Sequence, residues 1–243
     1  MISWSDTGIV ITSVKKQEKY QAIEIFTENH GLVRALCDAA VRMCCFSLVS
    51  IDWNGRNLYE PGFWRIQDMR QSLAKDTLPS VIIQRVCYLL HRVLPYGDRA
   101  PELFAYVRHI SGKISNCSSL EALNFYAYFE FLLLKTTGYG FDLSVCGICG
   151  CQEKIEYISR ISGRGISRKC HQFSAEKVFK VPDVWKAWDK DGYCPTDLEI
   201  TLNSIAITGH FIRKLNSIPN GHVITLDDNT ISMSQNQVRR TNV

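Results

Sequence analysis

The chain has 243 residues, of which 46% are hydrophobic and 21% charged, so it is long enough to bury a core and to form two domains. No apolar run reaches the ~18 residues that a membrane span needs, and the first residues lack the basic-then-apolar pattern of a signal peptide. We therefore expect a cytoplasmic protein with no membrane partner, whose ten cysteines are mostly reduced.

Three β-strands are predicted at the start of the chain. Residues 8–14 are mostly β-branched, residues 20–27 alternate between apolar and polar, and a third strand follows the turn at Gly31. Glycine supplies the backbone freedom that such a turn often needs. Three lysines fall in the loop between the first two strands: Lys15, Lys16 and Lys19. A basic loop on a small barrel often binds nucleic acid, and the alternative is a solvated hairpin tip.

A second hairpin completes the predicted barrel. Asn54-Gly55 lies between apolar runs at 46–53 and 58–68, and this is a strong hairpin signal. About five strands are then complete by residue 70, as an OB-fold requires. Four aromatic residues lie in this hairpin: Trp53, Tyr59, Phe63 and Trp64. Each is expected in the core or, on the outer face, as a platform on which single-stranded bases stack.

From Pro79 the hydrophobic period changes from two to about 3.6, which predicts helices. The first is expected to end before Pro95, with Val81 and Val93 in its apolar stripe, and the second to begin at Pro101. A third helix follows the capping box Ser118-x-x-Glu121. Because it is apolar on nearly all sides, we expect it at the centre of a bundle, and the alternative is a groove that binds a peptide.

The segment Cys146-Gly-Ile-Cys149-Gly-Cys151 is the one place where chemistry is expected. Two cysteines separated by two residues can chelate a tetrahedral zinc ion through a tight glycine turn. A thioredoxin-type redox motif fits less well, because that motif follows a strand and opens a helix. Here the segment follows a long helix and precedes short strands predicted at 155–158 and 165–167.

The positive charge is concentrated after this segment. Residues 153–190 hold nine lysines and arginines against five aspartates and glutamates, an excess equal to the net charge of +4 of the whole chain. Four of these basic residues lie within ten positions: Arg160, Arg164, Arg168 and Lys169. Such a patch can neutralise phosphates and release counterions, and the alternative is an ordinary solvated face.

The last predicted helix is expected to begin at a second capping box, Thr196-x-x-Glu199. Within it, His210 is expected to pack or to lie at the surface rather than to bind a metal.

Several of these segments resemble the RecO family of bacterial recombinational repair proteins. The resemblance rests on Trp4-x-Asp6-x-Gly8-Ile9-Val10, on the His-Gly element at 26–31, on Phe179-Lys-Val-Pro-Asp-Val-Trp185 and on residues 208–215. It implies an α+β fold with an N-terminal OB-fold β-barrel in residues 1–75. A helical domain would follow in residues 76–243, with a zinc-finger-like insertion at about 143–172.

The resemblance also implies a function without catalysis. A RecO-type mediator binds single- and double-stranded DNA, anneals complementary strands and, with RecR, helps RecA replace the single-strand DNA-binding protein (SSB) on single strands. The family binds the acidic, phenylalanine-ended tail of SSB, whose terminal carboxylate would pair with a basic residue beside an apolar groove.

Two features depart from the family pattern. RecO proteins commonly carry a basic stretch after the His-Gly turn, where only Arg34 and Arg42 remain in this chain, so we expect weaker DNA binding. Where a zinc-binding member has a second Cys-x-x-Cys, this chain has Cys170-His171-Gln172-Phe173. Cys146, Cys149 and Cys170 are therefore the expected ligands of a structural zinc, with His171 or Cys151 as the fourth. The alternative is a metal-free remnant, since members without zinc keep the insertion.

The competing hypothesis is a zinc-dependent or thiol redox enzyme centred on the Cys146 cluster. The chain has no His-Glu-x-x-His, Gly-rich phosphate loop or Gly-x-Ser-x-Gly motif. A site made of cysteines without an evident open position is structural rather than catalytic. The sequence therefore favours the nonenzymatic mediator.

Overall fold

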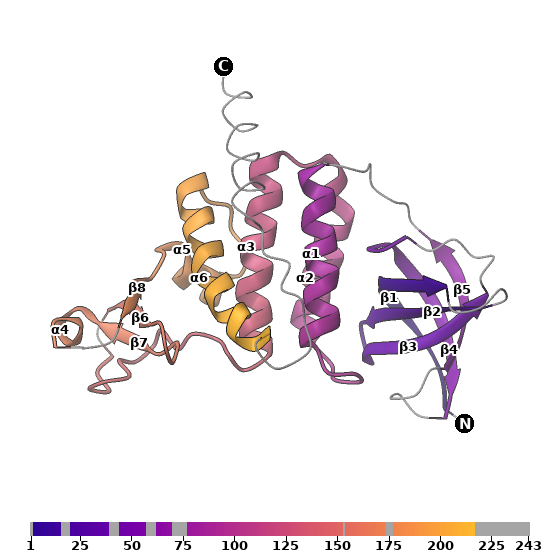
Figure 1. The fold of residues 1–243 in the computed structure, drawn as a ribbon, viewed down its shortest axis with the longest axis horizontal. Helices are drawn as coiled ribbons and strands as arrows, with labels where there is room; N and C mark the ends of the chain where they lie inside the picture. The colour runs from indigo at the N-terminus through magenta and orange to yellow at the C-terminus, as the bar shows by residue number, and fades with distance from the viewer. Residues whose placement is uncertain are drawn as a thin grey trace, which may run out of the picture. The chain divides into compact units, whose positions relative to one another are not determined.

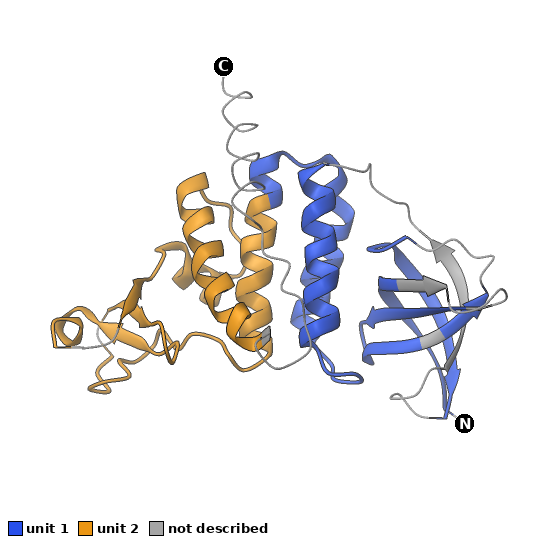
Figure 2. Cartoon of the chain, in the orientation of Figure 1, with its two compact units in different colours: residues 1–122, 224–243 blue, residues 123–223 orange. Residues whose placement is uncertain are grey.

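The computed structural model describes residues 2–15, 20–38, 44–56, 62–69, 77–152, 154–173 and 177–216. The chain forms two compact units, the first ending at Ala122 and the second beginning at Leu123, within helix α3 (Ser119–Thr136) (Figure 2). A domain boundary near residue 75 stays a prediction. No helix within the described residues is long and apolar enough to cross a membrane.

Unit 1 begins with a closed five-stranded barrel (Figure 1). Its strands are β1 (Ile2–Lys15), β2 (Tyr20–Thr27), β3 (Gly31–Asp38), β4 (Leu48–Gly55) and β5 (Gly62–Met69). Their order is β1-β2-β3-β5-β4, with β3 and β5 parallel and every other pair antiparallel. The predicted OB-fold is therefore confirmed.

The first strand closes the barrel because it pairs on both edges. Its first part pairs with β4 and its second part with β2, with a register shift between Val10 and Thr12. Gly8 lies where the two pairings overlap, and a Cβ atom there would lie 2.3 Å from the side chain of Ile25. Only glycine fits at this crossing without displacing a core side chain.

The barrel interior is filled by alternate residues of its strands. Its buried cluster consists of Val10, Ile23, Ile25, Val33, Cys37, Val49, Ile51 and Trp53. Trp53, one of the four aromatic residues singled out from the sequence, therefore belongs to the core. Tyr59 lies outside the described residues, as do the side chains of Phe63 and Trp64.

The turn between β2 and β3 depends on Gly31, as predicted. Its φ is +66°, and a Cβ atom would lie 2.0 Å from the carbonyl oxygen of Asp98. A side chain is therefore excluded both by backbone conformation and by space. The close approach also brings the chain after α1 against the barrel, where Gly97 N donates to Leu32 O at 2.9 Å.

Unit 1 continues with α1 (Leu78–Val93), α2 (Pro101–Lys113) and a short 3₁₀ turn (Ile114–Asn116). Thr77 caps α1 by accepting from Ser80 N at 3.4 Å, and Pro101 occupies the first turn of α2 as predicted. The predicted apolar stripe of α1 was partly wrong, because Val81 is 36% exposed and Val93 only half-buried. The buried face is rotated toward Ile83 and Cys87.

A buried carboxylate connects the barrel to α1. Glu24 of β2 is 7% exposed and accepts hydrogen bonds from Arg34 Nε at 2.8 Å, Tyr96 Oη at 2.5 Å and His91 Nδ1 at 2.5 Å. Burial alone would raise the pKa of Glu24, but these three donors lower it to about 2. The same contact and burial raise the pKa of Tyr96 to about 12, so that its hydroxyl remains a donor.

Unit 2 contains most of α3 and the helices α5 (Val184–Asp191) and α6 (Leu198–Asn216), with an insertion after α3. The insertion holds β6 (Ile155–Ser159), β7 (Gly165–Ser167), α4 (Arg168–His171) and β8 (Val178–Lys180). Its three strands form a sheet in the order β7-β6-β8. The strands β6 and β7 were predicted, whereas β8 and α5 were not.

Helix α3 begins and lies as the sequence predicted. Glu121 N donates to Ser118 Oγ at 3.3 Å, and Ser118 N donates to Glu121 Oε2 at 2.8 Å, which completes the capping box. All residues from 122 to 134 are buried. A helix that is buried on every side occupies the interior of its bundle.

The predicted capping box of α6 was wrong by one residue. Asp197 is the cap, because its carboxylate accepts from Ile200 N at 2.9 Å. The backbone of Thr196 is instead paired with buried Asn124 of α3, which accepts from Thr196 N at 2.8 Å and donates to Thr196 O at 3.0 Å. This pairing holds the entry of α6 against α3.

Aromatic rings join the helices of unit 2 to its insertion. The ring of Phe141, just before the insertion, stacks on that of Trp185 of α5 with centroids 4.5 Å apart. It also contacts the ring of Phe211 of α6 edge-on, with centroids 5.0 Å apart. Phe179 of β8 also contacts Phe211 at 6.3 Å. The two buried indoles of unit 2 are hydrogen-bonded, since Trp185 Nε1 donates to Ser204 Oγ and Trp188 Nε1 donates to Cys194 O, each at 3.0 Å.

We expect Glu24→Gln to lower the free energy of unfolding at pH 7 by about 2–3 kcal/mol, because the variant loses a carboxylate whose pKa is lowered from 4.5 to about 2. The stabilisation by Glu24 is fully present above the unfolded pKa of 4.5 and is lost as the pH falls toward 2. Urea unfolding of both proteins at pH 7 and pH 3 measures the difference, which should shrink at pH 3.

The matched control is Glu28→Gln, whose carboxylate is 46% exposed and lies 3.8 Å from Arg108. This change should cost less than about 0.5 kcal/mol. Equal losses for the two variants, or a loss for Glu24→Gln that does not depend on pH, would contradict the structural role of Glu24.

Candidate metal centre and basic surface of the insertion

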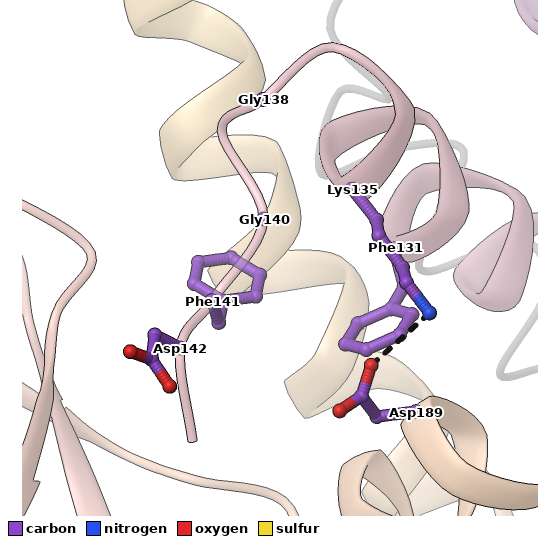
Figure 3. Close-up of a pocket in the computed structure, with 7 residues that line it drawn as sticks. All are labelled: Phe131, Lys135, Gly138, Gly140, Phe141, Asp142 and Asp189. Carbon is purple, nitrogen blue, oxygen red and sulfur yellow. Dashed lines mark ion pairs between the residues drawn. The ribbon is translucent and has the colours of Figure 1, made fainter. Parts of the chain in front are cut away.

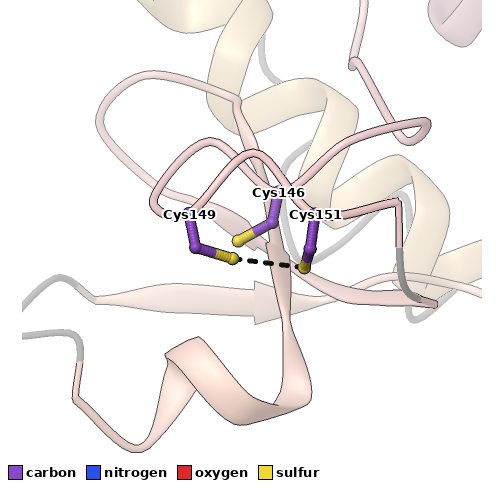
Figure 4. Close-up of side chains that lie close together, drawn as sticks. All are labelled: Cys146, Cys149 and Cys151. Carbon is purple, nitrogen blue, oxygen red and sulfur yellow. Dashed lines mark hydrogen bonds between the residues drawn. The ribbon is translucent and has the colours of Figure 1, made fainter.

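The cysteine segment forms a closed knuckle. Cys146 N donates to Cys151 O at 2.8 Å, and Gly150 N, with φ of +72° at that residue, donates back to Cys146 O at 2.8 Å. The sulfur atoms of Cys146, Cys149 and Cys151 converge within 4.8 Å of one another (Figure 4). These three residues could therefore hold a metal ion.

The surroundings of Cys146 and Cys149 shift the pKa values of these two thiols in opposite directions. Burial raises the pKa of Cys146, but backbone N–H groups of Ser167, Cys149 and Ile148 more than offset this and lower it to about 6. For Cys149 a hydrogen bond from Cys151 N lowers the pKa, whereas the neighbouring sulfurs of Cys151, Cys170 and Cys146 raise it to about 12. The exposed Cys149 thiol donates to Cys151 Sγ at 3.1 Å, and a metal ion bound by these sulfurs would release such a proton.

The two residues predicted on the far side of the knuckle have different surroundings. Cys170 of α4 lies close enough to Cys149 to raise its pKa, and Cys170 N donates to Ser167 Oγ at 3.4 Å. The ring of His171 instead stacks on Tyr157 of β6, with centroids 4.0 Å apart and an interplanar angle of 12°. The structure therefore brings Cys151 to Cys146 and Cys149, whereas His171 packs on the sheet.

The predicted basic residues of the insertion have distinct positions. The guanidinium of Arg160 lies 4.5 Å from the centre of the Phe179 ring, and the side chain of Arg164 packs on Gly147 of the knuckle. Arg168 and Lys169 are exposed on α4. His210 Nε2 donates to Arg160 O at 2.9 Å, and its ring packs on Phe179, so its predicted packing role is confirmed.

Of the predicted basic residues of the barrel, only Arg34 has a side chain that the structure describes. Lys16, Lys19 and Arg42 lie outside the described residues, as does the side chain of Lys15, the last residue of β1. The guanidinium of Arg34 is bonded to Glu24 and lies 4.2 Å from the centre of the Tyr96 ring. Although the Arg34 side chain is 46% exposed, it has a structural partner, and a DNA contact there stays a prediction.

A shallow pocket beside α4 gathers residues that the sequence did not single out together. It encloses about 460 Å³ and is lined by Lys154, Glu156, Arg168, Lys169, Gln172 and Phe173. Phe173 is 88% exposed. The available sequence signals were the position of Lys154 in the basic segment and the phenylalanine three residues after Cys170.

A second pocket of about 300 Å³ lies at the end of α3 (Figure 3). It is lined by Phe131, Lys135, Gly138, Gly140, Phe141, Asp142 and Asp189. The rings of Phe131 and Phe141 are 6.3 Å apart, and Lys135 Nζ lies 3.2 Å from Asp189 Oδ1 of α5. Lys135 is therefore a basic residue in a pocket that also contains two aromatic rings.

An OB-fold barrel combined with a basic, cysteine-bearing insertion is typical of proteins that act on nucleic acids. The profile of the family described as "Recombination protein O C terminal" matches residues 75–183. A protein of Ruegeria sp. named DNA repair protein RecO is 30% identical over 222 residues, covering 87% of this chain and 88% of the relative. The chain therefore belongs to the RecO family of DNA repair proteins, as the resemblance implied.

Other relatives with the same name give similar figures. The protein of Cereibacter sphaeroides is 28% identical over 236 residues, which cover 91% of this chain and 93% of the relative. That of Wolbachia sp. subsp. Drosophila simulans is 27% identical over 222 residues, which cover 87% and 91%. The similarity thus extends through both units.

Proposed function

We propose that this chain is a nonenzymatic recombination mediator of the RecO type. It binds single- and double-stranded DNA, anneals complementary strands and, with RecR, helps load RecA onto single strands coated with SSB. The observation that carries the proposal is the exposed basic surface of the insertion, within a chain of the RecO family. Its excess of four positive charges within residues 153–190 is suited to phosphates.

Phosphate binding without base readout suits strand annealing. Contacts to the backbone position a strand but carry no sequence information, so the Watson–Crick edges of the bases stay free to pair. Neutralisation by Arg160, Arg164, Arg168 and Lys169 also lowers the repulsion between two approaching strands. Residues 1–45 hold five basic and five acidic side chains, so the barrel adds little long-range attraction.

The proposed protein partner is the acidic, phenylalanine-ended tail of SSB. Supporting this, the pocket at the end of α3 offers two aromatic rings, Phe131 and Phe141, that can receive a phenylalanine side chain. Lys135 could pair with the terminal carboxylate in exchange for Asp189, since their ion pair is half-exposed. Lys135→Ala should therefore weaken binding of a labelled SSB-tail peptide.

We propose further that the insertion holds one structural zinc ion, bound by Cys146, Cys149, Cys151 and Cys170. Four thiolates are a donor set that zinc prefers, and bound zinc would tie α4 to the knuckle. The arrangement argues against a thiol redox enzyme, because Cys146, the cysteine whose pKa is lowered to about 6, is only 1% exposed, so that a substrate cannot reach its sulfur.

Zinc content tests this ligand set. We expect native mass spectrometry to find one zinc per chain, and Cys146→Ser or Cys151→Ser to abolish it. His171→Gln is the control and should retain the metal, because its ring stacks on Tyr157. Retention by Cys151→Ser together with loss by His171→Gln would make His171 the fourth ligand, and absence of zinc after reconstitution would leave the insertion metal-free.

The DNA-binding function is tested by fluorescence anisotropy on labelled single strands and duplexes at several salt concentrations. Arg164→Glu/Arg168→Glu should weaken binding to all sequences and reduce the slope of log K against log salt by roughly two. The control is Arg92→Glu/Lys113→Glu, which reverses two exposed charges of unit 1 and should leave the slope nearly unchanged. An unchanged slope in the first variant would refute the assignment of the basic surface.

Annealing of complementary strands coated with SSB, with and without RecR, tests the mediator role. Acceleration by the wild-type chain and its loss in Arg164→Glu/Arg168→Glu are the expected results.

A further inference from the structure

We infer that the pocket beside α4 is a binding site for single-stranded nucleic acid, in which a base stacks on Phe173 and the flanking phosphates contact Lys154, Arg168 and Lys169. This inference rests on the proposed DNA binding and adds to it a location and a preference for unpaired strands.

The charge of the pocket suits a phosphate backbone. Three of its six lining residues are basic and one, Glu156, is acidic. Lys154, Arg168 and Lys169 are exposed, so they lie at the surface that a strand would approach. A groove with such an excess of cations attracts a polyanion and binds it in a salt-dependent manner.

The position of Phe173 points to base stacking. A single exposed apolar residue is common on protein surfaces and by itself indicates nothing. Here the ring, 88% exposed, lies in the same pocket as three cations. An aromatic platform within a basic groove is the arrangement by which proteins bind single strands without reading their sequence.

The backbone that carries Phe173 is held in place. Ser167 caps α4 by accepting from Cys170 N at 3.4 Å, and Phe173 N donates to Cys170 O at 3.1 Å. The stacked rings of Tyr157 and His171 fix α4 on β6. The backbone that carries the ring is therefore ordered before a ligand arrives, which lowers the entropic cost of binding.

The pocket fits a base better than a duplex or an acidic peptide. The flat face of a base is accessible only where the strand is unpaired. Phe173 is the one apolar side chain among the six that line the pocket, so a peptide phenylalanine would find no apolar enclosure there. A base needs only one aromatic face.

The test compares wild-type protein, Phe173→Ala and Phe173→Tyr in anisotropy titrations with labelled dT20, a 20-base-pair duplex and a labelled acidic peptide that ends in phenylalanine. Phe173→Ala should weaken binding to dT20 by roughly five- to a hundredfold, as expected for loss of one stacked base. Affinity for the duplex should change less than about twofold, and the salt slope should not change because no charge is removed. Phe173→Tyr should retain binding.

The matched control is Tyr139→Ala, which removes another exposed aromatic side chain of unit 2, 56% exposed, and should leave dT20 binding unchanged. Circular dichroism confirms that each variant is folded.

If wild-type protein binds dT20 with a steep salt slope but Phe173→Ala binds equally well, the inference is overturned while the proposed DNA binding stands. If Phe173→Ala affects only the peptide, the pocket is a peptide site and the inference is again overturned. If wild-type protein binds neither DNA, both the inference and the proposed function fail.

Discussion

The carboxylate of Glu24 is the interaction on which unit 1 depends. It lies on the barrel wall and accepts hydrogen bonds from β3, from α1 and from the segment after α1, through Arg34, His91 and Tyr96. A buried charge is tolerated only when its lone pairs are satisfied, so these elements must assemble together. Its consequence for function is that Arg34, one of two arginines left in the stretch after the His-Gly turn, is paired with Glu24 although its side chain is 46% exposed.

Because Arg34 is paired, the remaining exposed candidate DNA-binding residues that the structure describes lie on the insertion. In many OB-folds the barrel itself carries the nucleic-acid surface. Here Trp53 is inside the barrel and Arg34 is paired, whereas Arg168, Lys169 and Phe173 are exposed on the insertion. The distribution of charge along the sequence predicts the same segment, because the electrostatic potential of a surface depends on the number and sign of its charged residues more than on the fold.

Much of the fold could be predicted where local rules act alone. Alternation of residues predicted the strands, and the reciprocal Ser118–Glu121 hydrogen bonds are a local property of the chain. The errors occur where tertiary contacts compete. Thr196 has the chemistry of a cap, but Asn124, far away in sequence, pairs with its backbone and leaves Asp197 to cap the helix. The short strand β8 was not predicted because three residues are too few to show an alternation of apolar and polar side chains. Helix α5 was not predicted because it begins within residues 179–185, which were interpreted only through the family resemblance.

The candidate site likewise has some features that follow from local sequence patterns and others that depend on tertiary contacts. The convergence of Cys146 and Cys149 follows from their spacing, whereas the position of His171 depends on Tyr157, whose ring stacks on the imidazole. No local pattern predicts that stacking. The pocket around Phe173 likewise combines a residue of β6, Glu156, with residues of α4 and its flanks, and only the folded sheet places them together.

The knuckle has a thermodynamic consequence of its own. Its three sulfurs come from six consecutive residues, and two backbone hydrogen bonds close the loop. Closing so short a loop costs little chain entropy. Many small zinc domains are unfolded until metal orders them. In this knuckle the backbone hydrogen bonds supply part of that ordering, so the convergence of the three sulfurs does not depend on a distant segment of the chain.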